Sequence, residues 1–188
     1  MRLTGKLPPR FNADWSVLTI FVRRRLREYS GTLHNRRGAN DKLKTVKSVA
    51  VILKREFDST IKEWLRHVKL VPSLVAVPLS DAERAVHLPK LFEDVLNRLR
   101  LARGAEPLHS TNAFAHGKLR FSQGYSVPML FEESRIFQVT SFGTLHRHQN
   151  ELDQNRVLSD VIIIADEADR QLTETVRSFM TAQQDAVA

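Results

Sequence analysis

The stretch AFAHGKLRFSQGYSVPMLFEESRIFQ, residues 113–138, decides the fold of this 188-residue chain. At about 100° per residue, one face of a helix collects apolar side chains together with His116, Arg120 and Gly124. The other members of this face are Leu119, Gln123, Val127, Leu130, Phe131, Ser134 and Phe137. The opposite side carries Phe121, Tyr125 and Met129 at a spacing of four. Because a helix that is apolar on two sides lies inside a bundle or against a partner subunit, the stretch predicts a central helix of an all-α bundle.

The polar residues on this face require partners. A buried polar group without a hydrogen bond costs about 1–3 kcal/mol, so His116 and Arg120 each need one, and Glu133 on the flank is the nearest acidic candidate. Gly124 follows Arg120 by about one turn and would let a neighbouring backbone or ligand approach closely. Pro128 removes a backbone donor in mid-helix, so we expect a kink there.

The rest of the chain also has helical periodicity. Further helices are predicted at about 15–29, 42–69, 89–103 and 151–184. In the second of these, the expected core positions are Val46, Val49, Ala50, Leu53, Phe57, Ile61, Trp64, Leu65 and Val68; in the third they are Leu91, Phe92, Val95, Leu96 and Leu99. Ser80 and Glu83 form a capping box that starts a short helix reaching His87. Pro89 is favoured at the first position of the helix that follows.

The last segment has an approximate heptad pattern. Its apolar or small members are Leu158, Val161, Ala165, Ala168, Leu172, Thr175 and Phe179. This spacing predicts a long C-terminal helix that pairs with a second copy of the chain in a homodimer. A buried strand over residues 157–165, which are rich in β-branched side chains, is the alternative. The absence of a companion strand elsewhere in the sequence argues against it.

The net charge of +8 is concentrated near the N-terminus. Residues 1–47 hold 12 Lys or Arg against 3 acidic residues, which leaves 17 against 18 for the remainder. We therefore divide the chain into a basic arm with one helix, residues 1–41, and a helical bundle, residues 42–184. A cluster in the arm, formed by Arg23, Arg24, Arg25, Arg27, Arg36 and Arg37, has the charge to meet nucleic acid, anionic lipid or an acidic protein. A solvated helix face explains it more simply, because no aromatic platform or nucleic-acid motif accompanies it.

Several kinds of chemistry are excluded or not expected. The chain has no cysteine, which excludes disulfides and thiolate chemistry and favours the cytoplasm. His146 and His148 would point apart on a helix, so we expect no metal site and no cofactor. There is no phosphate-binding glycine loop, nucleophile elbow or kinase signature, and no apolar run of about 18 residues that could cross a membrane. The sequence predicts a chain without a catalytic site.

Seven residues stand in the order HGxxRxxxGxxxxxLxxExR: His116, Gly117, Arg120, Gly124, Leu130, Glu133 and Arg135. This order resembles the closing motif of the RsbRD-type N-terminal domain. Upstream support comes from Trp64 in a long helix, from Leu79-Ser80-Asp81 and from His87-Leu88-Pro89 before a leucine-rich helix. The resemblance covers about residues 44–184. The basic arm and Pro128 depart from the family pattern.

The resemblance implies a function in signalling. RsbRD-type domains are helical input domains at the front of stressosome co-antagonists and of many bacterial sensor histidine kinases. It therefore implies a non-catalytic, cytoplasmic, dimeric sensory domain whose last helix continues into a kinase or regulatory output domain. The motif residues His116, Arg120, Gly124, Glu133 and Arg135 would line a pocket or switch interface that senses a small molecule, an anion, pH or a partner. The alternative role for these motif residues is a polar network that stabilises the bundle. The alternative function for the chain is that of a nucleic-acid-binding or scaffold protein that acts through its basic arm.

Overall fold

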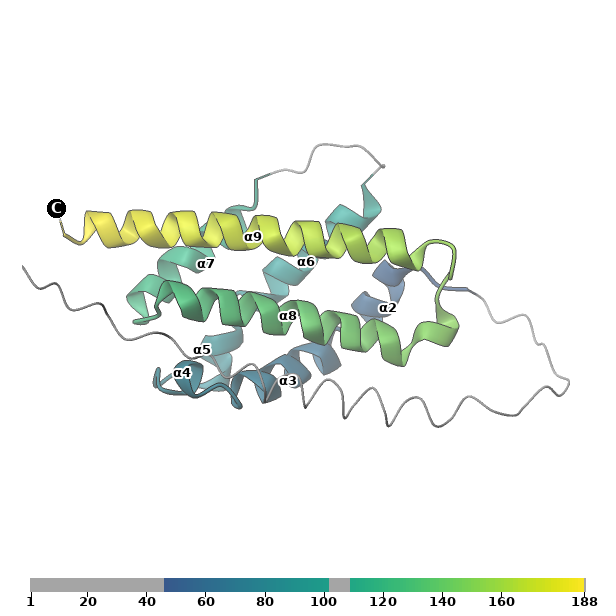
Figure 1. Cartoon of the computed structure of the whole chain (residues 1–188), viewed down its shortest axis with the longest axis horizontal. Coiled ribbons are helices and arrows are strands. Elements are labelled where there is room, and N and C mark those ends of the chain that lie inside the picture. Colours follow the sequence, from purple (N-terminus) through teal and green to yellow (C-terminus); the bar gives the residue numbers. More distant parts are fainter. Residues whose placement is uncertain (1–45, 102–108, 188) are drawn as a thin grey trace, which may run out of the picture. The chain divides into compact units, whose positions relative to one another are not determined.

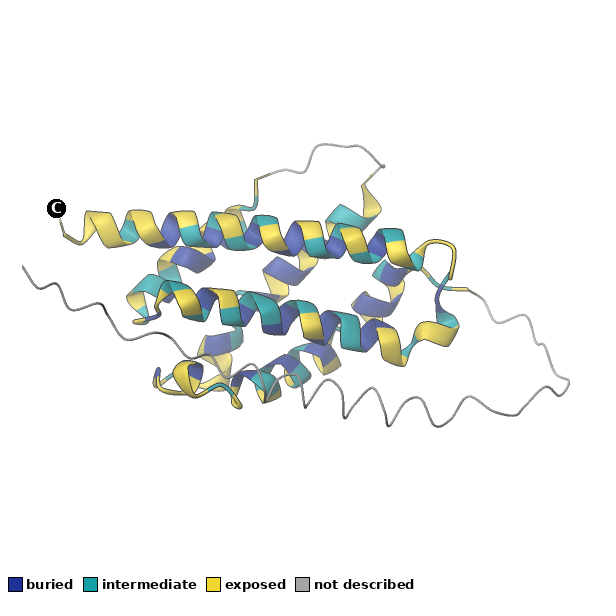
Figure 2. Ribbon diagram, viewed as in Figure 1, coloured by how far each residue is buried: buried dark blue, intermediate teal, exposed yellow. Residues whose placement is uncertain are grey.

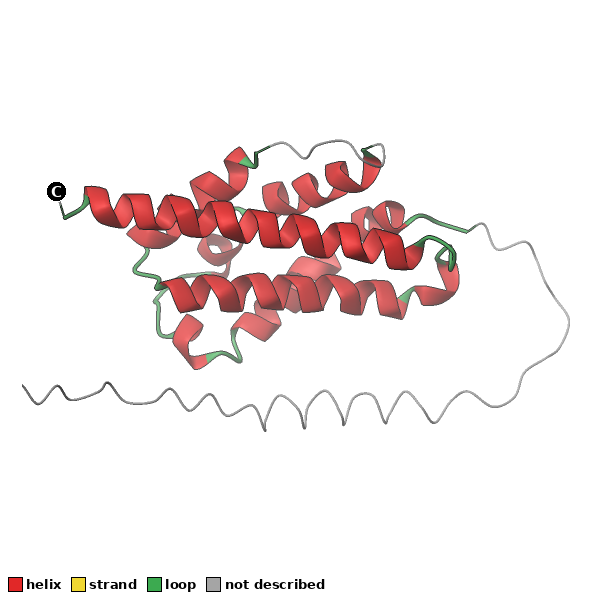
Figure 3. Ribbon diagram, turned by 45° about the horizontal axis from the view of Figure 1, so that its top comes forward, coloured by secondary structure: helices red, strands yellow, loops and turns green. Residues whose placement is uncertain are grey.

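The computed structural model describes residues 46–101 and 109–187 as a set of packed helices (Figures 1 and 3). No strand occurs within these ranges, and their only bridge of β type joins Lys47 to Leu152. The prediction of an all-α fold is confirmed for this part of the chain. None of its helices is long and apolar enough to cross a membrane. The predicted helix at 15–29 lies outside the described residues, as does the whole arm.

The predicted single helix at 42–69 is wrong. Two helices occupy its described part, α2 (Val49–Arg55) and α3 (Phe57–Val68), with the break at Glu56. The break lets each piece follow a different neighbour, since α2 contacts α6 and α8 while α3 contacts α5 and α8. The first piece begins only after Ser48, whose side chain accepts a bond from the Val51 amide. Val46 precedes this cap and is exposed, which corrects its assignment to the core.

The middle of the chain follows the predicted boundaries more closely. It contains α4 (Pro72–Val75), α5 (Asp81–Ala85) and α6 (Leu88–Arg100). The capping box at Ser80 is present, with both of its reciprocal bonds, and Pro89 lies in the first turn of α6. Of the core positions expected in α6, Leu91, Phe92, Val95 and Leu96 are buried.

The stretch at 113–138 is not one kinked helix, which corrects the prediction. It is divided between α7 (Thr111–Ser122) and α8 (Val127–Arg147). Gly124 lies in the turn between them with φ at +80°, a left-handed conformation that suits glycine. Pro128 stands in the first turn of α8, where no intrahelical partner is needed for a backbone N–H, so it starts a helix instead of bending one.

A short 3-10 helix, η1 (Gln149–Glu151), leads into α9 (Val157–Asp185), which has 29 residues. Residues 157–165 are helical, so the strand alternative is wrong. The last helix runs beside α8 and also contacts α6 and α7 (Figure 1). Within the heptad pattern, Ala168, Thr175 and Phe179 are buried inside this chain, and Leu172 packs against the same core. Packing within the bundle therefore explains the heptad spacing from Ala168 onwards, whereas Leu158 is 71% exposed, and pairing with a second copy stays a prediction.

The core lies between α9, α8 and the shorter helices behind them. Buried and exposed residues alternate at helical spacing along α8 and α9 (Figure 2). Phe92 is fully buried in this core and packs edge to face against two other rings. The distance between ring centroids is 5.1 Å to Phe57 and 5.8 Å to Phe137. Trp64 is buried nearby, and its indole donates to the carbonyl oxygen of Glu133 at 3.4 Å. At Trp64 and Glu133, this apolar core borders a group of buried charged side chains.

Candidate functional site: a buried polar cluster

Arg120 is the centre of the buried polar cluster, which we define as Arg84, His116, Arg120, Tyr125 and Glu133. Its side chain is 0% exposed. The guanidinium binds Glu133 through two contacts, from Nε to Oε2 at 2.9 Å and between Nη2 and Oε1 at 2.9 Å. A two-point contact of this kind is the strongest arrangement for an arginine and a carboxylate.

Arg120 makes two further hydrogen bonds. Nη1 donates to Oε1 of Gln123 at 2.7 Å, and Nη2 donates to the backbone carbonyl of Arg84 at 2.6 Å. The guanidinium also lies over the ring of Tyr125, with 4.7 Å between its central carbon and the ring centroid. Arg120 therefore joins α7 to the last turn of α5, to α8 and to the turn at Gly124.

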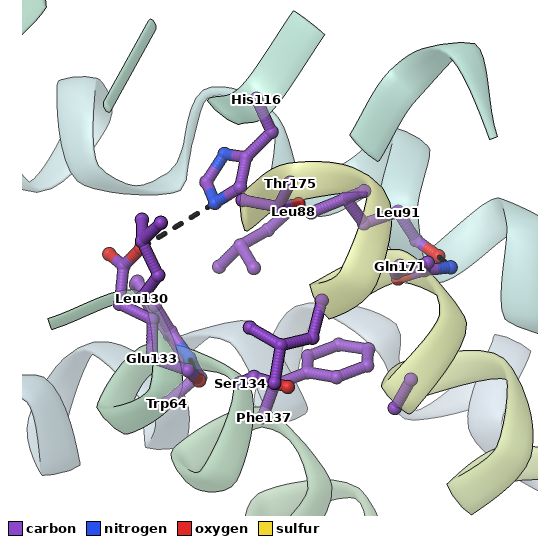
Figure 4. Close-up of a pocket in the computed structure, with 12 residues that line it drawn as sticks. Trp64, Leu88, Leu91, His116, Leu130, Glu133, Ser134, Phe137, Gln171 and Thr175 are labelled. Atoms are coloured by element: carbon purple, nitrogen blue, oxygen red, sulfur yellow. Dashed lines mark hydrogen bonds and ion pairs between the residues drawn. The ribbon is translucent and has the colours of Figure 1, made fainter. Parts of the chain in front are cut away.

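Glu133 is contacted by three side chains, two from α7 and one from the turn that follows it. Besides Arg120, the Tyr125 hydroxyl donates to its Oε1 at 2.9 Å, and His116 Nε2 lies 3.5 Å from its Oε2 (Figure 4). Burial alone would raise the pKa of Glu133, but the bond from His116 and the charge of Arg120 outweigh it and hold the pKa below its ordinary value. The carboxylate is therefore charged although its residue is only 4% exposed. For Tyr125, burial and then the nearby Glu133 charge raise the pKa to about 12.

Arg84 is the second buried arginine of the cluster. It donates to the backbone carbonyls of Leu74 at 2.8 Å and Val77 at 2.5 Å, and to the Tyr125 hydroxyl at 3.5 Å. It thereby fixes the connection between α4 and α5. No carboxylate is among these partners. The cluster as described carries two arginine charges against one carboxylate.

A small cavity of about 40 Å³ adjoins His116 and Glu133. It is lined mainly by apolar side chains, with Gln171 and Thr175 of α9 on the side away from Glu133 (Figure 4). Gln171 is fixed by donating to the Leu91 carbonyl at 3.0 Å. Because one water needs about 10–15 Å³ of such space, the cavity has room for about three or four waters but not for a metabolite.

Gly117 is the point where α7 crosses α9. A Cβ at this position would overlap the backbone carbonyl of Thr175 and the hydroxyl of Ser178. The two hydroxyls bind α7 directly: Thr175 donates to the Ala113 carbonyl at 3.2 Å and Ser178 to the Phe114 carbonyl at 2.7 Å. The close approach that we had expected at Gly124 occurs at Gly117, since a Cβ on Gly124 would meet nothing within 4 Å.

The structure gathers only some of the predicted site residues. His116, Arg120 and Glu133 lie together, whereas Arg135 pairs with Glu132 on the surface at 2.8 Å. Gly124 contributes only a turn. The basic residues Arg23, Arg24, Arg25, Arg27, Arg36 and Arg37 lie outside the described residues.

Sequence reasoning missed Arg84, Tyr125 and Gly117. Arg84 belongs to the capping-box helix, where an arginine is ordinarily solvated, and Tyr125 was placed on the opposite apolar side because the helix was assumed to be continuous. Gly117 belongs to the motif, but nothing local in the sequence marks it as a helix crossing. A turn placed at Gly124, which the Gly-x-Ser-x-Pro sequence at 124–128 favours, is the signal that could have found Tyr125.

The two closely spaced histidines lie away from the cluster. His148 Nδ1 is 2.9 Å from Glu151 Oε1, and Arg55 binds the same carboxylate at 2.8 Å. His146 is exposed at the end of α8. Within 46–101 and 109–187, no three histidine, cysteine or acidic residues are grouped so as to hold a metal ion.

Comparisons with known proteins add no identification. No protein-family model, no curated protein and no solved structure matches this chain.

Proposed function

We propose that this chain is a non-catalytic, cytoplasmic sensory domain of a bacterial signal-transduction protein, in which the buried polar cluster receives the signal and α9 passes it on. The observation that carries the proposal is the fully buried Arg120–Glu133 pair beside a cavity that α9 also lines. Replacing such a pair by apolar residues is often neutral or stabilising, so stability alone does not account for it. The order of residues that resembles the RsbRD-type motif points to the same class of protein.

The cluster has a direct mechanical path to α9. His116 lies one position before Gly117, where α7 lies so close to α9 that even a Cβ would overlap the Thr175 carbonyl and the Ser178 hydroxyl. A change at His116 or Glu133 that moves α7 must therefore move Thr175 and Ser178, because their hydroxyls bind the carbonyls of Ala113 and Phe114. Helix shifts of this kind are a known form of signal transmission.

The output and the partners complete the proposal. The output is a histidine kinase or a stressosome-type regulator that follows α9. The signal is pH, a partner protein, or an anion or small molecule no larger than the cavity of about 40 Å³ admits. A second copy pairs through α9. The exposed apolar side chains that this helix offers for pairing are Leu158, Ile162 and Met180.

A fusion to a histidine-kinase core tests this function. The end of α9 is joined to the kinase core in several helical registers. The rate of autophosphorylation is then compared for the unchanged chain, Glu133→Gln and Glu132→Gln. Glu133→Gln keeps the shape but removes the buried charge, so we expect at least a several-fold change in rate. Glu132→Gln is the matched control, since Glu132 is adjacent but pairs with Arg135 on the surface. Equal rates for all three chains in every register would refute the proposal.

A further inference from the structure

His87 and His116 face each other at the edge of the cluster. Their ring centroids are 5.6 Å apart and their planes are inclined by 51°. His116, in α7, is 7% exposed, and His87 is half-buried immediately before α6. In the part of the chain that the structure describes, the Nδ1 atoms of both rings are buried without a hydrogen-bond partner.

The surroundings of this histidine pair are cationic. Arg84 and Arg120 against Glu133 leave one positive charge in excess while both imidazoles are neutral. Lys90 of α6 adds another positive charge near His87, and Tyr125 stays an uncharged phenol up to high pH. On the side of α9, the cavity beside His116 is lined by Gln171 and Thr175, which carry no charge.

We propose that the His87–His116 pair is a proton-sensitive switch that separates the start of α6 from α7 when the pH falls. In this proposal the proton is the signal. The proposal rests on the proposed sensory function only for the output that the switch controls. An imidazolium must donate from both nitrogens, yet neither Nδ1 has an acceptor in the closed arrangement. A protonated His87 must therefore turn towards solvent, and this movement opens the contact with His116.

The direction of the pH effect follows from the charges. Burial lowers the pKa of His87 from 6.5, and repulsion from His116, when that ring is also protonated, and from Arg120 and Lys90 lowers it further. The unfolded chain then binds the proton at His87 more readily than the folded chain does. The contribution of neutral His87 to folding stability is therefore fully present above pH 6.5, and it is lost as the pH falls below 6.5 towards the lower pKa of the folded state.

Trp64 offers a fluorescent reporter of the opening. The chain has two tryptophans, so Trp15→Phe leaves Trp64, which borders the cavity and bonds the Glu133 carbonyl. In this background we would record Tm and Trp64 emission from pH 7.5 to 5.0 for the unchanged cluster and for His87→Gln. His109→Gln is the control, because the His109 side chain is 85% exposed.

We expect the Tm of the unchanged cluster to fall by roughly 4 °C or more over this range, with a shift in Trp64 emission. His87→Gln should lose at least half of both changes and His109→Gln should keep them. If His87→Gln does not fold, an NMR titration of the imidazoles in the unsubstituted chain replaces it. His87 titrating at or above pH 6.5, or a pH response that His87→Gln leaves intact, would overturn the switch. Either result leaves the sensory function standing, because that function is judged by phosphorylation.

Discussion

Arg120→Met tests the energetic role of the buried pair most directly. The methionine keeps an unbranched apolar stem in the core but removes the guanidinium. Glu133 then stays a carboxylate that is only 4% exposed, with Tyr125 and His116 as its remaining partners. The Arg84 carbonyl and the Gln123 side chain lose their donor as well.

The expected cost follows from leaving a charge unpaired. Removing one partner of a buried ion pair costs about 3–5 kcal/mol, whereas replacing both partners by apolar residues is often neutral. Arg120→Met should therefore lower the free energy of unfolding by about 3–5 kcal/mol. Adding Glu133→Leu should restore about 1–3 kcal/mol of this loss, since it removes the unpaired charge but leaves the Tyr125 hydroxyl without its acceptor.

Urea unfolding followed by helical circular dichroism measures these free energies. Arg135→Met is the control: the Arg135 side chain is 38% exposed in its pair with Glu132, and exposed pairs contribute about 0–1 kcal/mol. A loss below about 1 kcal/mol for Arg120→Met would show that the pair is not a buried charge pair in the folded protein. If the stability lost in the double variant equals the sum of the losses in Arg120→Met alone and Glu133→Leu alone, the coupling between Arg120 and Glu133 is refuted.

Gly117→Ala should destabilise the chain by at least about 1–3 kcal/mol and loosen the contact of α7 with α9, because its Cβ would overlap the Thr175 backbone. Gly143→Ala is the control, because its Cβ would meet only an Arg147 side chain at 3.8 Å. Thermal melting of this variant should show a gain in stability of up to about 1 kcal/mol. Equal melting temperatures for the two variants would contradict this account. The Tyr125 phenol should titrate near pH 12 by ultraviolet absorbance, a phase that Tyr125→Phe removes. Since the folded state keeps this proton longer than the unfolded chain, stability should fall as the pH rises from 10 to 12, and a Tyr125 phase near pH 10 would contradict the buried bond to Glu133.

The pairing of Arg120 with Glu133 shows how far sequence reasoning reached. The need for an acidic partner followed from an arginine on an apolar face, and Glu133 was the nearest candidate. However, the two residues are 13 positions apart, which is about 20 Å along one continuous helix, too far for a side-chain contact. The pairing is possible only because the chain turns at Gly124 and brings the start of α8 back to the Arg120 side chain.

The breaks in the helices could not be predicted for a related reason. Glu56 is an ordinary helix former, and nothing local marks it as the end of α2. The break depends on which neighbours α2 and α3 contact, and those neighbours come from distant parts of the chain. Gly124 and Pro128 did carry a local signal, but a tolerated glycine and a kinking proline explained it equally well.

By itself, the sequence determined what depends on neighbouring residues: the helical class, the capping box at Ser80, the start of α6 within one residue of Pro89, and the burial of Trp64 and Phe92. Spacing and backbone chemistry act over one or two turns, so a pattern can be read locally. Only the tertiary structure decided the contacts: Arg84 and Tyr125 in the cluster, Gly117 at the crossing, and the burial of Ala168, Thr175 and Phe179 of α9 inside their own bundle. These are contacts between segments far apart in the chain, and which segments meet depends on how all the apolar faces pack at once.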